Sequence, residues 1–379
     1  MSSQITKNQH YVPQFLLRGF GIADEETPKV HIFDVKKNVV RQNQSIKEVF
    51  SQNFFYDKKN EIENFLSLKI EGPAAELINK FRDNDFSTLN NGGTELIKFM
   101  CCQNGRTVAG REDALNFINA HFQQIVSDLV RLNGLEVTDP KSLTVGPSDK
   151  DSMRYFTAAQ ALSAVLDSKG MEDLRLHVLV NNTQKEFILS DHAVSRYNWL
   201  YRELKDPRIG SMLAKGVKLF LPLSGRFCLC AYDSKAYKFG KRSSDVSELR
   251  YEPDVDWLNQ LQMRSAHSFV AFSSLSMMSY IQNLYGSFYG KKVYSRNGLH
   301  LSQEDIGDDK LKTTHMVYTE QIQLKEKPTF FKVLKRAGRD SQYEERDPVC
   351  SQALRMLKNQ VHEDRVSNQA LPSLRRNGF

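Results

Sequence analysis

Two neighbouring pairs of strand-like segments constrain the fold of this 379-residue chain more than any other feature. Residues 174–181 (LRLHVLVN) alternate apolar and polar side chains, and the apolar residues 186–189 follow after a short polar turn. Residues 217–223 and 226–232 form a second pair around a Ser-Gly turn. Short turns join antiparallel strands, whereas parallel strands need long crossovers. The pattern therefore predicts an antiparallel sheet.

Helical periodicity recurs on both sides of this sheet region, so the whole chain is predicted to be an α+β protein in which several helices pack on the sheet. Within residues 62–81, Gly72-Pro73 predicts a kink or two helices, with Glu71 at the break. The longest apolar pattern, residues 254–284, predicts one long helix in the C-terminal half. A β-hairpin is expected at residues 29–40, and further helices are expected at 94–108, 111–132, 151–168 and 348–366.

The chain is long for a single core and predicts about two domains, or one domain with an appendage. Residues 133–150 are rich in Gly, Asp, Pro and Ser and predict an internal linker. We expect an N-terminal hairpin and helical part at 1–135, and a central sheet with the long helix at 150–297, which share one composite core. Residues 298–379 are expected to form a polar C-terminal appendage.

Targeting and cysteine signals both point to the cytoplasm. No apolar run approaches the roughly 20 residues that cross a bilayer, and the polar residues 1–8 do not resemble a signal peptide. We therefore expect a cytoplasmic protein with no membrane partner. Five cysteines without CxxC spacing fit a reducing compartment and predict no zinc site.

Positive charge is concentrated in one part of the chain. The net charge is +7, and between Arg196 and Arg250 twelve Lys/Arg residues face five Asp/Glu residues. A localised positive segment is typical of a protein that binds phosphates. The basic region 196–250 therefore predicts a nucleic-acid partner, and the alternative is a solvated, lysine-rich surface.

The N-terminal segment HYVPQFLLRGF, residues 10–20, is the first candidate for a functional site. It places His10, Gln14 and Arg18 among large apolar and aromatic side chains. A solvent-exposed loop would not need so much apolar surface, and a plain core strand would not need the polar groups. We expect the segment to anchor itself in the core while its polar side chains face a shared site.

A second candidate follows the apolar residues 187–189, where Ser190 and Asp191 stand at the end of a predicted strand. Strand ends are positions where a rigid scaffold presents functional groups. Asp191 either accepts hydrogen bonds from backbone N–H groups of a turn or acts as a metal ligand or base. Asn259, near the start of the predicted long helix, either faces solvent or joins the same site.

A third candidate lies on the helix expected at 94–108. Gln103 and Arg106 share one helical side with Phe99 and Cys102. Buried polar side chains need partners, because an unpaired one costs roughly 1–3 kcal/mol. Arg106 therefore either bridges to a structural carboxylate such as Glu71 or faces a phosphate or a substrate carboxylate.

These stretches together resemble DUF4238, a family of unknown function. The family pattern includes a His-Tyr-Val-Pro-Gln-Phe segment, a Glu-bearing helix, a Gln-x-x-Arg-Thr element and a Phe-x-x-Ser-Asp-x-x-Val segment. A Pro-Leu-Ser strand and a Leu-Asn pair on a helix follow. Ala193 departs from the pattern, since the family often has proline there. The resemblance implies a site and no particular reaction. The matching stretches here are residues 10–20, 70–71, 103–107, 187–194, 221–224 and 258–259.

The first functional hypothesis is a metal-dependent phosphodiesterase or nuclease-like hydrolase that acts on nucleic acid or a nucleotide. In this hypothesis His10, Glu71 and Asp191 are catalytic, and Glu71 and Asp191 hold a divalent metal such as Mg²⁺. The substrate would be bound by Gln14, Arg18, Gln103, Arg106, Ser190 and Asn259. Defence against foreign genetic elements is a candidate process that no residue indicates.

The alternative is a non-catalytic module that binds a nucleic acid or a protein. In that hypothesis His10, Gln103 and Arg106 form a buried polar network that specifies the core. An enzyme that acts on a small molecule unrelated to nucleic acid is a third hypothesis. Turnover and the salt dependence of binding distinguish the three.

Overall fold

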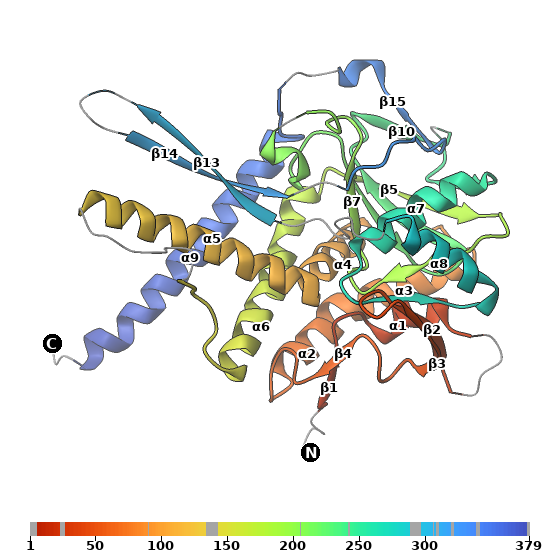
Figure 1. Cartoon of the computed structure of the whole chain (residues 1–379), viewed down its shortest axis with the longest axis horizontal. Helices are drawn as coiled ribbons and strands as arrows, with labels where there is room; N and C mark the ends of the chain where they lie inside the picture. Colours follow the sequence, from red (N-terminus) through yellow and green to blue (C-terminus); the bar gives the residue numbers. More distant parts are fainter. Residues whose placement is uncertain are drawn as a thin grey trace.

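The computed structural model describes residues 6–22, 27–89, 91–133, 143–204, 206–241, 243–288, 297–305, 307, 311–319, 322–338 and 342–376. The fold is α+β with mostly antiparallel sheets, as predicted. Figure 1 shows a body of sheets and helices from which three elements extend to the left. They are α5 (Val108–Leu132), α9 (Pro348–Arg376) and the hairpin of β13 (Asn297–Asp305) and β14 (Leu311–Thr319).

A five-stranded sheet in the order β11-β5-β9-β8-β7 forms one half of the body. The predicted hairpin of β8 and β9 is confirmed, with Leu221 opposite Leu229. The other predicted hairpin is wrong, because β5 pairs with β9 and residues 189–190 join another sheet. On the side of β5 away from β9, strand β11 pairs with β5 in parallel. The strands are β5 (Arg175–Asn181), β7 (Ser195–Asn198), β8 (Val217–Pro222), β9 (Phe227–Tyr232) and β11 (Val246–Leu249).

A four-stranded sheet in the order β3-β2-β12-β6 forms the other half. Its β2–β3 hairpin is the one predicted at residues 29–40. Its third strand, β12 (Phe269–Phe272), corrects the prediction of one long helix at 254–284. A short run of consecutive apolar residues does not distinguish a buried strand from a helix. The other strands are β2 (Lys29–Asp34), β3 (Val39–Ser45) and β6 (Leu189–Ser190), and the helices beside β12 are α7 (Glu252–Ser265) and α8 (Met278–Gly286).

The helices predicted at 94–108, 111–132 and 151–168 form close to their expected bounds, whereas α9 extends to Arg376, past its predicted end at 366. A π-helical turn at Ser67–Glu71 joins α2 (Glu61–Leu66) to α3 (Gly72–Arg82), where the break was predicted. The Asp149 carboxylate accepts a hydrogen bond from the Ser152 N–H and caps α6. Half of the predicted linker, residues 134–142, lies outside the described residues. Further elements are α1 (Gln14–Leu17), α4 (Gly93–Gly105), α6 (Lys150–Asp167), β1 (Asn8–His10), β4 (Ser51–Asn53), β10 (Tyr237–Phe239) and β15 (Phe331–Val333).

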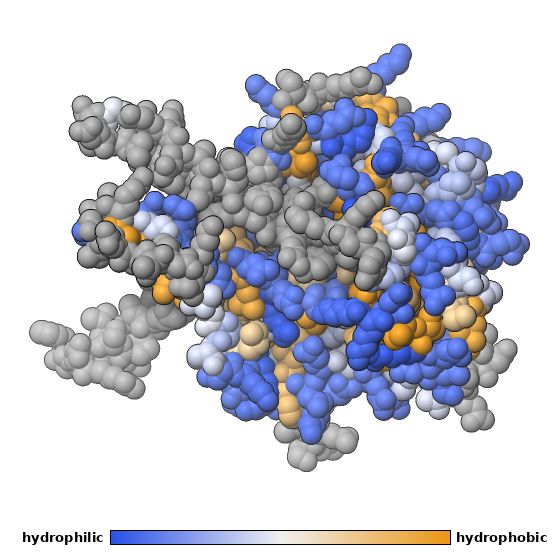
Figure 2. All heavy atoms as spheres, viewed as in Figure 1, coloured by the Kyte–Doolittle hydropathy of each residue, from blue (hydrophilic) through white to orange (hydrophobic). Residues whose placement is uncertain are grey.

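One large hydrophobic cluster draws buried residues from all three segments predicted from the sequence, between Tyr11 and Ala337. The C-terminal segment, expected to be polar, contributes Phe330 and Phe331 to this cluster. On the face shown in Figure 2, the described residues are mainly hydrophilic, and apolar side chains appear in small separate groups. Within the described ranges, no helix combines the length and the apolar character needed to cross a membrane.

Candidate functional site

Arg106 ties the N-terminal segment to α4 and to the π-helical turn. Its guanidinium donates to the carbonyl oxygens of His10 (2.9 Å) and Tyr11 (3.2 Å) and forms a 2.6 Å ion pair with Glu71. The Gln103 amide donates to the same Tyr11 carbonyl at 2.8 Å. Arg106 is 1% exposed. The alternative in which Arg106 bridges to Glu71 is therefore confirmed.

Glu63 belongs to the same cluster, and sequence reasoning missed it. Burial raises the pKa of Glu63 to about 7, and the nearby Glu71 carboxylate also raises it while Arg106 opposes the shift. Its Oε2 atom is buried and makes no hydrogen bond to the described residues. His10 donates from Nε2 to the Ile46 carbonyl at 3.0 Å, and burial lowers its pKa. Glu63 lies two turns before Glu71, a spacing that could have indicated their shared side.

The cation that holds the rest of the N-terminal segment is Arg82, not Arg18. The Arg82 guanidinium donates to the carbonyl oxygens of Phe15 (2.8 Å), Leu16 (3.1 Å) and Leu223 (2.6 Å). Burial lowers the pKa of Arg82 to about 10, and the positive charge of Arg18 adds to this shift. Arg18 itself is exposed. Arg82 therefore fastens α1 to the end of β8.

Two other positions of the segment, Gly19 and Gln14, lie at or beside this contact. A Cβ atom at Gly19 would lie 2.0 Å from the Leu223 carbonyl oxygen, so the backbones approach too closely for any side chain. Gln14 is partly buried at the start of α1. The close approach explains a glycine in the segment without any reference to a ligand.

Asp191 holds the start of β12. Its carboxylate accepts hydrogen bonds from the backbone N–H groups of His267 (2.7 Å), Ser268 (2.8 Å) and Phe269 (3.1 Å). Burial raises the pKa of Asp191 to about 6, and these hydrogen bonds and the nearby imidazole of His267 oppose the shift. The alternative in which Asp191 accepts backbone N–H groups therefore holds, although the groups belong to a distant segment.

Ser190 and Asn259 connect β6 to α7. The Ser190 N–H donates to Gln262 Oε1 at 2.9 Å. Asn259 Oδ1 accepts from the Ile188 N–H at 3.1 Å, and its amide donates to the Glu186 carbonyl at 2.9 Å. Both side chains are buried. Asn259 is therefore not solvent-facing, and the polar face of α7 recognises backbone groups of the strand region.

The predicted site residues thus belong to two networks that adjoin at Tyr11. His10, Glu71, Gln103 and Arg106 form the first, and Asp191 belongs to the second. The pKa of Tyr11 is raised mainly by burial and further by the charge of Asp191. Among the described residues, no group of three His, Cys, Asp or Glu side chains has a geometry that could hold a metal ion.

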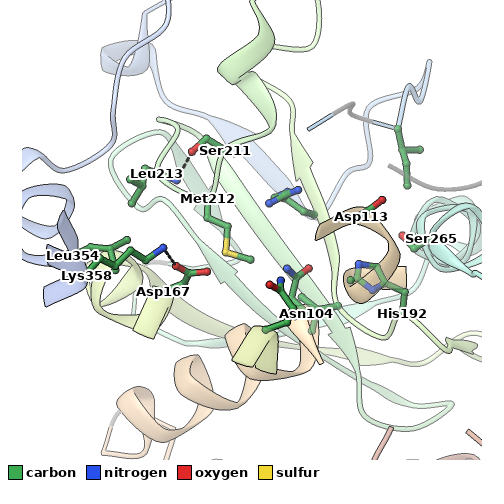
Figure 3. A pocket seen from close by; sticks show the side chains of 16 residues that line it. Asn104, Asp113, Asp167, His192, Ser211, Met212, Leu213, Ser265, Leu354 and Lys358 are labelled. Atoms are coloured by element: carbon green, nitrogen blue, oxygen red, sulfur yellow. Dashed lines mark hydrogen bonds and ion pairs between the residues drawn. The ribbon is translucent and has the colours of Figure 1, made fainter. Parts of the chain in front are cut away.

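A polar pocket of about 380 Å³ lies next to both networks (Figure 3). Its polar side chains come from α4, α5, α6, α7, α9 and β7 and from the loops that contain His192 and Ser211, so the pocket depends on the assembly of the whole body. Asn104 directly follows Gln103 of the first network, and His192 directly follows Asp191 of the second. The polar lining includes Asn104 from α4, Asp113 from α5, Asp167 from α6, Arg196 from β7 and Lys358 from α9.

Arg196 is the cation of this pocket that is not paired. Within the described residues its guanidinium makes no hydrogen bond and no ion pair, whereas Lys358 pairs with Asp167 at 2.6 Å. Burial lowers the pKa of Arg196 to about 10, and the charges of Asp113 and Asp167 oppose the shift. The side chain therefore stays protonated at neutral pH. Adjacent strand residues point to opposite faces, so Arg196 lies away from its buried neighbour Tyr197.

His192 and Ser211 add neutral polar groups to the pocket. Burial lowers the pKa of His192 to about 4, and Arg196 adds to the shift, so the imidazole is neutral at pH 7. The Thr107 hydroxyl lies 2.7 Å from His192 Nδ1, so Nε2 is the ring nitrogen that remains for a ligand. Ser211 Oγ accepts from the Leu213 N–H at 3.1 Å and is also hydrogen-bonded to the Tyr343 side chain.

The charged side chains of the lining are two carboxylates and two cations, so the pocket is close to neutral before a ligand binds. A free guanidinium with neutral donors beside it suits a ligand with a single negative charge. Sequence reasoning counted Arg196 within the basic region but did not single it out. Its place two residues after the Ser-Asp-x-x-Val stretch was the available signal.

Five of the ten described Lys/Arg residues in the basic region 196–250 form ion pairs in the folded chain. Glu344 and Asp347, from the C-terminal segment, pair with Lys215 (2.6 Å) and Lys235 (3.0 Å). Lys218 is buried, and Lys205 and Arg242 lie outside the described residues. The described part of the region therefore does not present one continuous free positive surface. The other pairs are Arg202–Glu203, Arg208–Asp206 and Arg250–Glu248.

Comparison with known proteins gives one match. The model of a protein family described as a protein of unknown function (DUF4238) matches residues 8–276. This range contains both networks and most of the pocket, but not Lys358. No curated protein and no solved structure matches the chain.

Proposed function

The chain belongs to the DUF4238 family, and we propose that it is a nucleotide- or nucleic-acid-binding protein whose polar pocket binds a phosphodiester group. The observation that carries this proposal is Arg196, a protonated guanidinium inside the pocket with no hydrogen bond or ion pair to the described residues. An uncompensated donor fork of this kind is expected to take an oxyanion.

The charge of the pocket favours binding of a phosphodiester over a phosphate monoester. A phosphodiester carries one negative charge, whereas a terminal phosphate carries about 1.5 to 2 at pH 7. Arg196 can neutralise one charge, and a second one would face the carboxylates of Asp113 and Asp167 without compensation. We therefore expect a nucleotide unit joined by a diester to bind more tightly than its monoester form.

Geometry and size agree with a small ligand unit. Polar atoms of His192, Asn104 and Ser211 belong to the pocket lining, and the Asn104 amide has donors to offer. A pocket of about 380 Å³ falls at the lower end of the usual range for small-molecule sites, about 300–1,000 Å³. One nucleotide unit therefore fits better than a long stretch of polymer.

Calorimetric titration with a 3′,5′-cyclic nucleotide and with the matching nucleoside monophosphate tests this function. We expect the cyclic diester to bind and the monoester to bind more weakly. Arg196→Met should weaken diester binding at least about tenfold, the loss expected for one charged hydrogen bond. Arg250→Met is the matched control, because Arg250 is exposed and pairs with Glu248 on the surface. Equal affinity in Arg196→Met and wild type would contradict the proposal.

Hydrolysis of the diester is the second candidate, and the neutral imidazole of His192 beside Arg196 favours it. A base with a pKa of about 4 is weak at neutral pH, so general-base catalysis here would be modest. In the metal-dependent form derived from the sequence, Glu71 and Asp191 would hold Mg²⁺. Hydrolysis of bis(p-nitrophenyl) phosphate with Mg²⁺, and its loss in Glu71→Gln and Asp191→Asn, would support that form. Equal rates with EDTA would contradict it.

A further inference from the structure

A serine, a histidine and a glutamate from two distant parts of the chain form a hydrogen-bonded chain at the start of β12. The Ser268 hydroxyl lies 2.8 Å from His267 Nδ1, and His267 Nε2 lies 2.9 Å from Glu112 Oε2. A nucleophile, a base and a carboxylate that orients the base are the three parts of a hydrolytic triad, whatever the order along the sequence. None of the three side chains lines the polar pocket.

From this arrangement we propose that Glu112, His267 and Ser268 form a second, independent site, in which Ser268 is a nucleophile toward carboxylic esters. The tautomer is consistent along the chain of bonds. When Ser268 donates to Nδ1, the ring proton is on Nε2, where it donates to the Glu112 carboxylate. The serine uses Nδ1 and the carboxylate uses Nε2, which exchanges the two nitrogens relative to the arrangement in chymotrypsin-like proteases.

Asp191 gives this site a rigid backbone. Its carboxylate accepts the N–H groups of residues 267, 268 and 269, which are the histidine, the serine and the next residue. The Ser268 carbonyl accepts from the Val35 N–H at 2.9 Å, so both peptide groups of the serine are held. Catalytic groups need such support to keep their geometry. Asp191 is therefore a positioning residue for this site, which accounts for a buried carboxylate that does not itself line the pocket.

Lys36 supplies positive charge at the same place. Its Nζ atom lies 3.5 Å from both ring nitrogens of His267. The His267 side chain is 9% exposed and Glu112 is 44% exposed, and Ser268 is half-buried. An ammonium group at this position can stabilise the oxyanion that forms when a carbonyl is attacked.

The reaction balances with water as the only co-reactant. Ser268 Oγ forms a bond to the ester carbonyl carbon while its proton moves to His267 Nδ1. The ester C–O bond then breaks, and the same proton goes to the leaving alkoxide, which departs as an alcohol. Water repeats the sequence on the acyl-serine: it gives a proton to Nδ1, the acid leaves, and Ser268 Oγ takes the proton back.

Labelling of the full chain with a fluorophosphonate probe tests the proposal. The probe forms a bond between Ser268 Oγ and phosphorus and releases fluoride, and peptide mass spectrometry locates the label. We expect label at Ser268 and none in Ser268→Ala. The control is Ser276→Ala, which removes an exposed serine that bonds only Ser274 and should leave labelling unchanged.

Variants of the other two residues distinguish an activated serine from a merely accessible one. His267→Ala should slow labelling by about 10²-fold or more. Glu112→Gln should slow it at least about tenfold while Glu112→Asp restores part of the rate, and both should melt within a few degrees of wild type. Absence of label at Ser268, or labelling rates unchanged in His267→Ala and Glu112→Gln, would overturn the proposal. Loss of diester binding by Arg196→Met is a separate result and does not bear on it.

Discussion

The Arg106 network and the Arg196 pocket use the same residue type in opposite ways. The guanidinium of Arg106 donates hydrogen bonds to two backbone carbonyls and to Glu71, all inside the protein. Arg196 has lost much of its hydration by burial, yet bonds no described residue, and only the longer-range charges of Asp113 and Asp167 compensate it. Satisfied polar groups stabilise one fold, whereas unsatisfied ones keep capacity for a ligand. The difference separates structural residues from candidate binding residues.

The contrast also changes which residues of the family motifs we interpret as structural and which as binding residues. Four motif positions are buried and bond distant segments: Gln103, Arg106 and Asp191 bond backbone groups, and Ser190 donates to the Gln262 side chain. They connect the N-terminal segment, the π-helical turn and the two sheets. The side chains that keep polar atoms for a ligand are Asn104, His192 and Arg196, which follow these motif positions by one or a few residues.

Removal of Arg106 is expected to have the largest effect on stability. Arg106→Met leaves the Glu71 carboxylate without its donor and removes one of the two donors to each of the His10 and Tyr11 carbonyls, and breaking a buried pair costs about 3–5 kcal/mol. Urea unfolding measures the free-energy change. Arg250→Met is the control and should change stability by no more than about 1 kcal/mol, because its ion pair with Glu248 is exposed. Equal losses in the two variants would remove the distinction drawn here.

Removal of Asp191 is expected to have the second largest effect on stability. Asp191→Ala leaves three backbone N–H groups without an acceptor, and each orphaned group costs about 1–3 kcal/mol. Part of this loss is offset, because burial of the charged carboxylate is itself unfavourable, so we expect about 3 kcal/mol in total. The control is Asp149→Ala, where one N–H loses its cap and about 1 kcal/mol is expected. A loss in Asp191→Ala no larger than in the control would contradict the positioning role.

Arg196→Met should leave stability nearly unchanged or slightly raised, because no described bond is lost and a buried charge is removed. Binding of the cyclic diester should fall at least about tenfold. Thermal melting and calorimetric titration measure the two effects on the same sample. A marked loss of stability with intact binding would assign Arg196 to the structural class instead.

The pH dependence of stability offers the smallest and most specific test. The pKa of Glu63 is raised to about 7 in the folded chain, against about 4.3 in an unfolded one. Between these values the folded state binds more protons, so the Glu63 contribution to stability falls as pH rises from about 4.3 to 7. Glu63→Gln should flatten this part of the curve, measured by urea unfolding at several pH values. An unchanged slope would contradict the raised pKa.

Local sequence patterns predicted much of this fold and less of its site. The hairpins at 29–45 and 217–232 have short turns between alternating strands, which makes their pairing a local property. The pairing of β6 with β12 joins segments about eighty residues apart, so no local signal reveals it. For the same reason β12 was mistaken for part of a helix.

The site shows the same limit at the level of side chains. The bridge from Arg106 to Glu71 followed from helical spacing, because a buried arginine needs a carboxylate. Whether a polar residue is satisfied depends on partners from other elements. The sequence therefore singled out Ser190 and Asp191 correctly. It did not reveal that their hydrogen bonds form within the fold, or that the donors of Arg196 do not.

Thermal unfolding of wild type and Arg196→Met, each with and without a saturating 3′,5′-cyclic nucleotide, tests the central claim most directly. A ligand that binds only the folded state raises the melting temperature. The account predicts that both proteins melt at nearly the same temperature without ligand and that only wild type is stabilised by it. Equal stabilisation of both proteins, or a variant that melts far below wild type without ligand, would contradict the account.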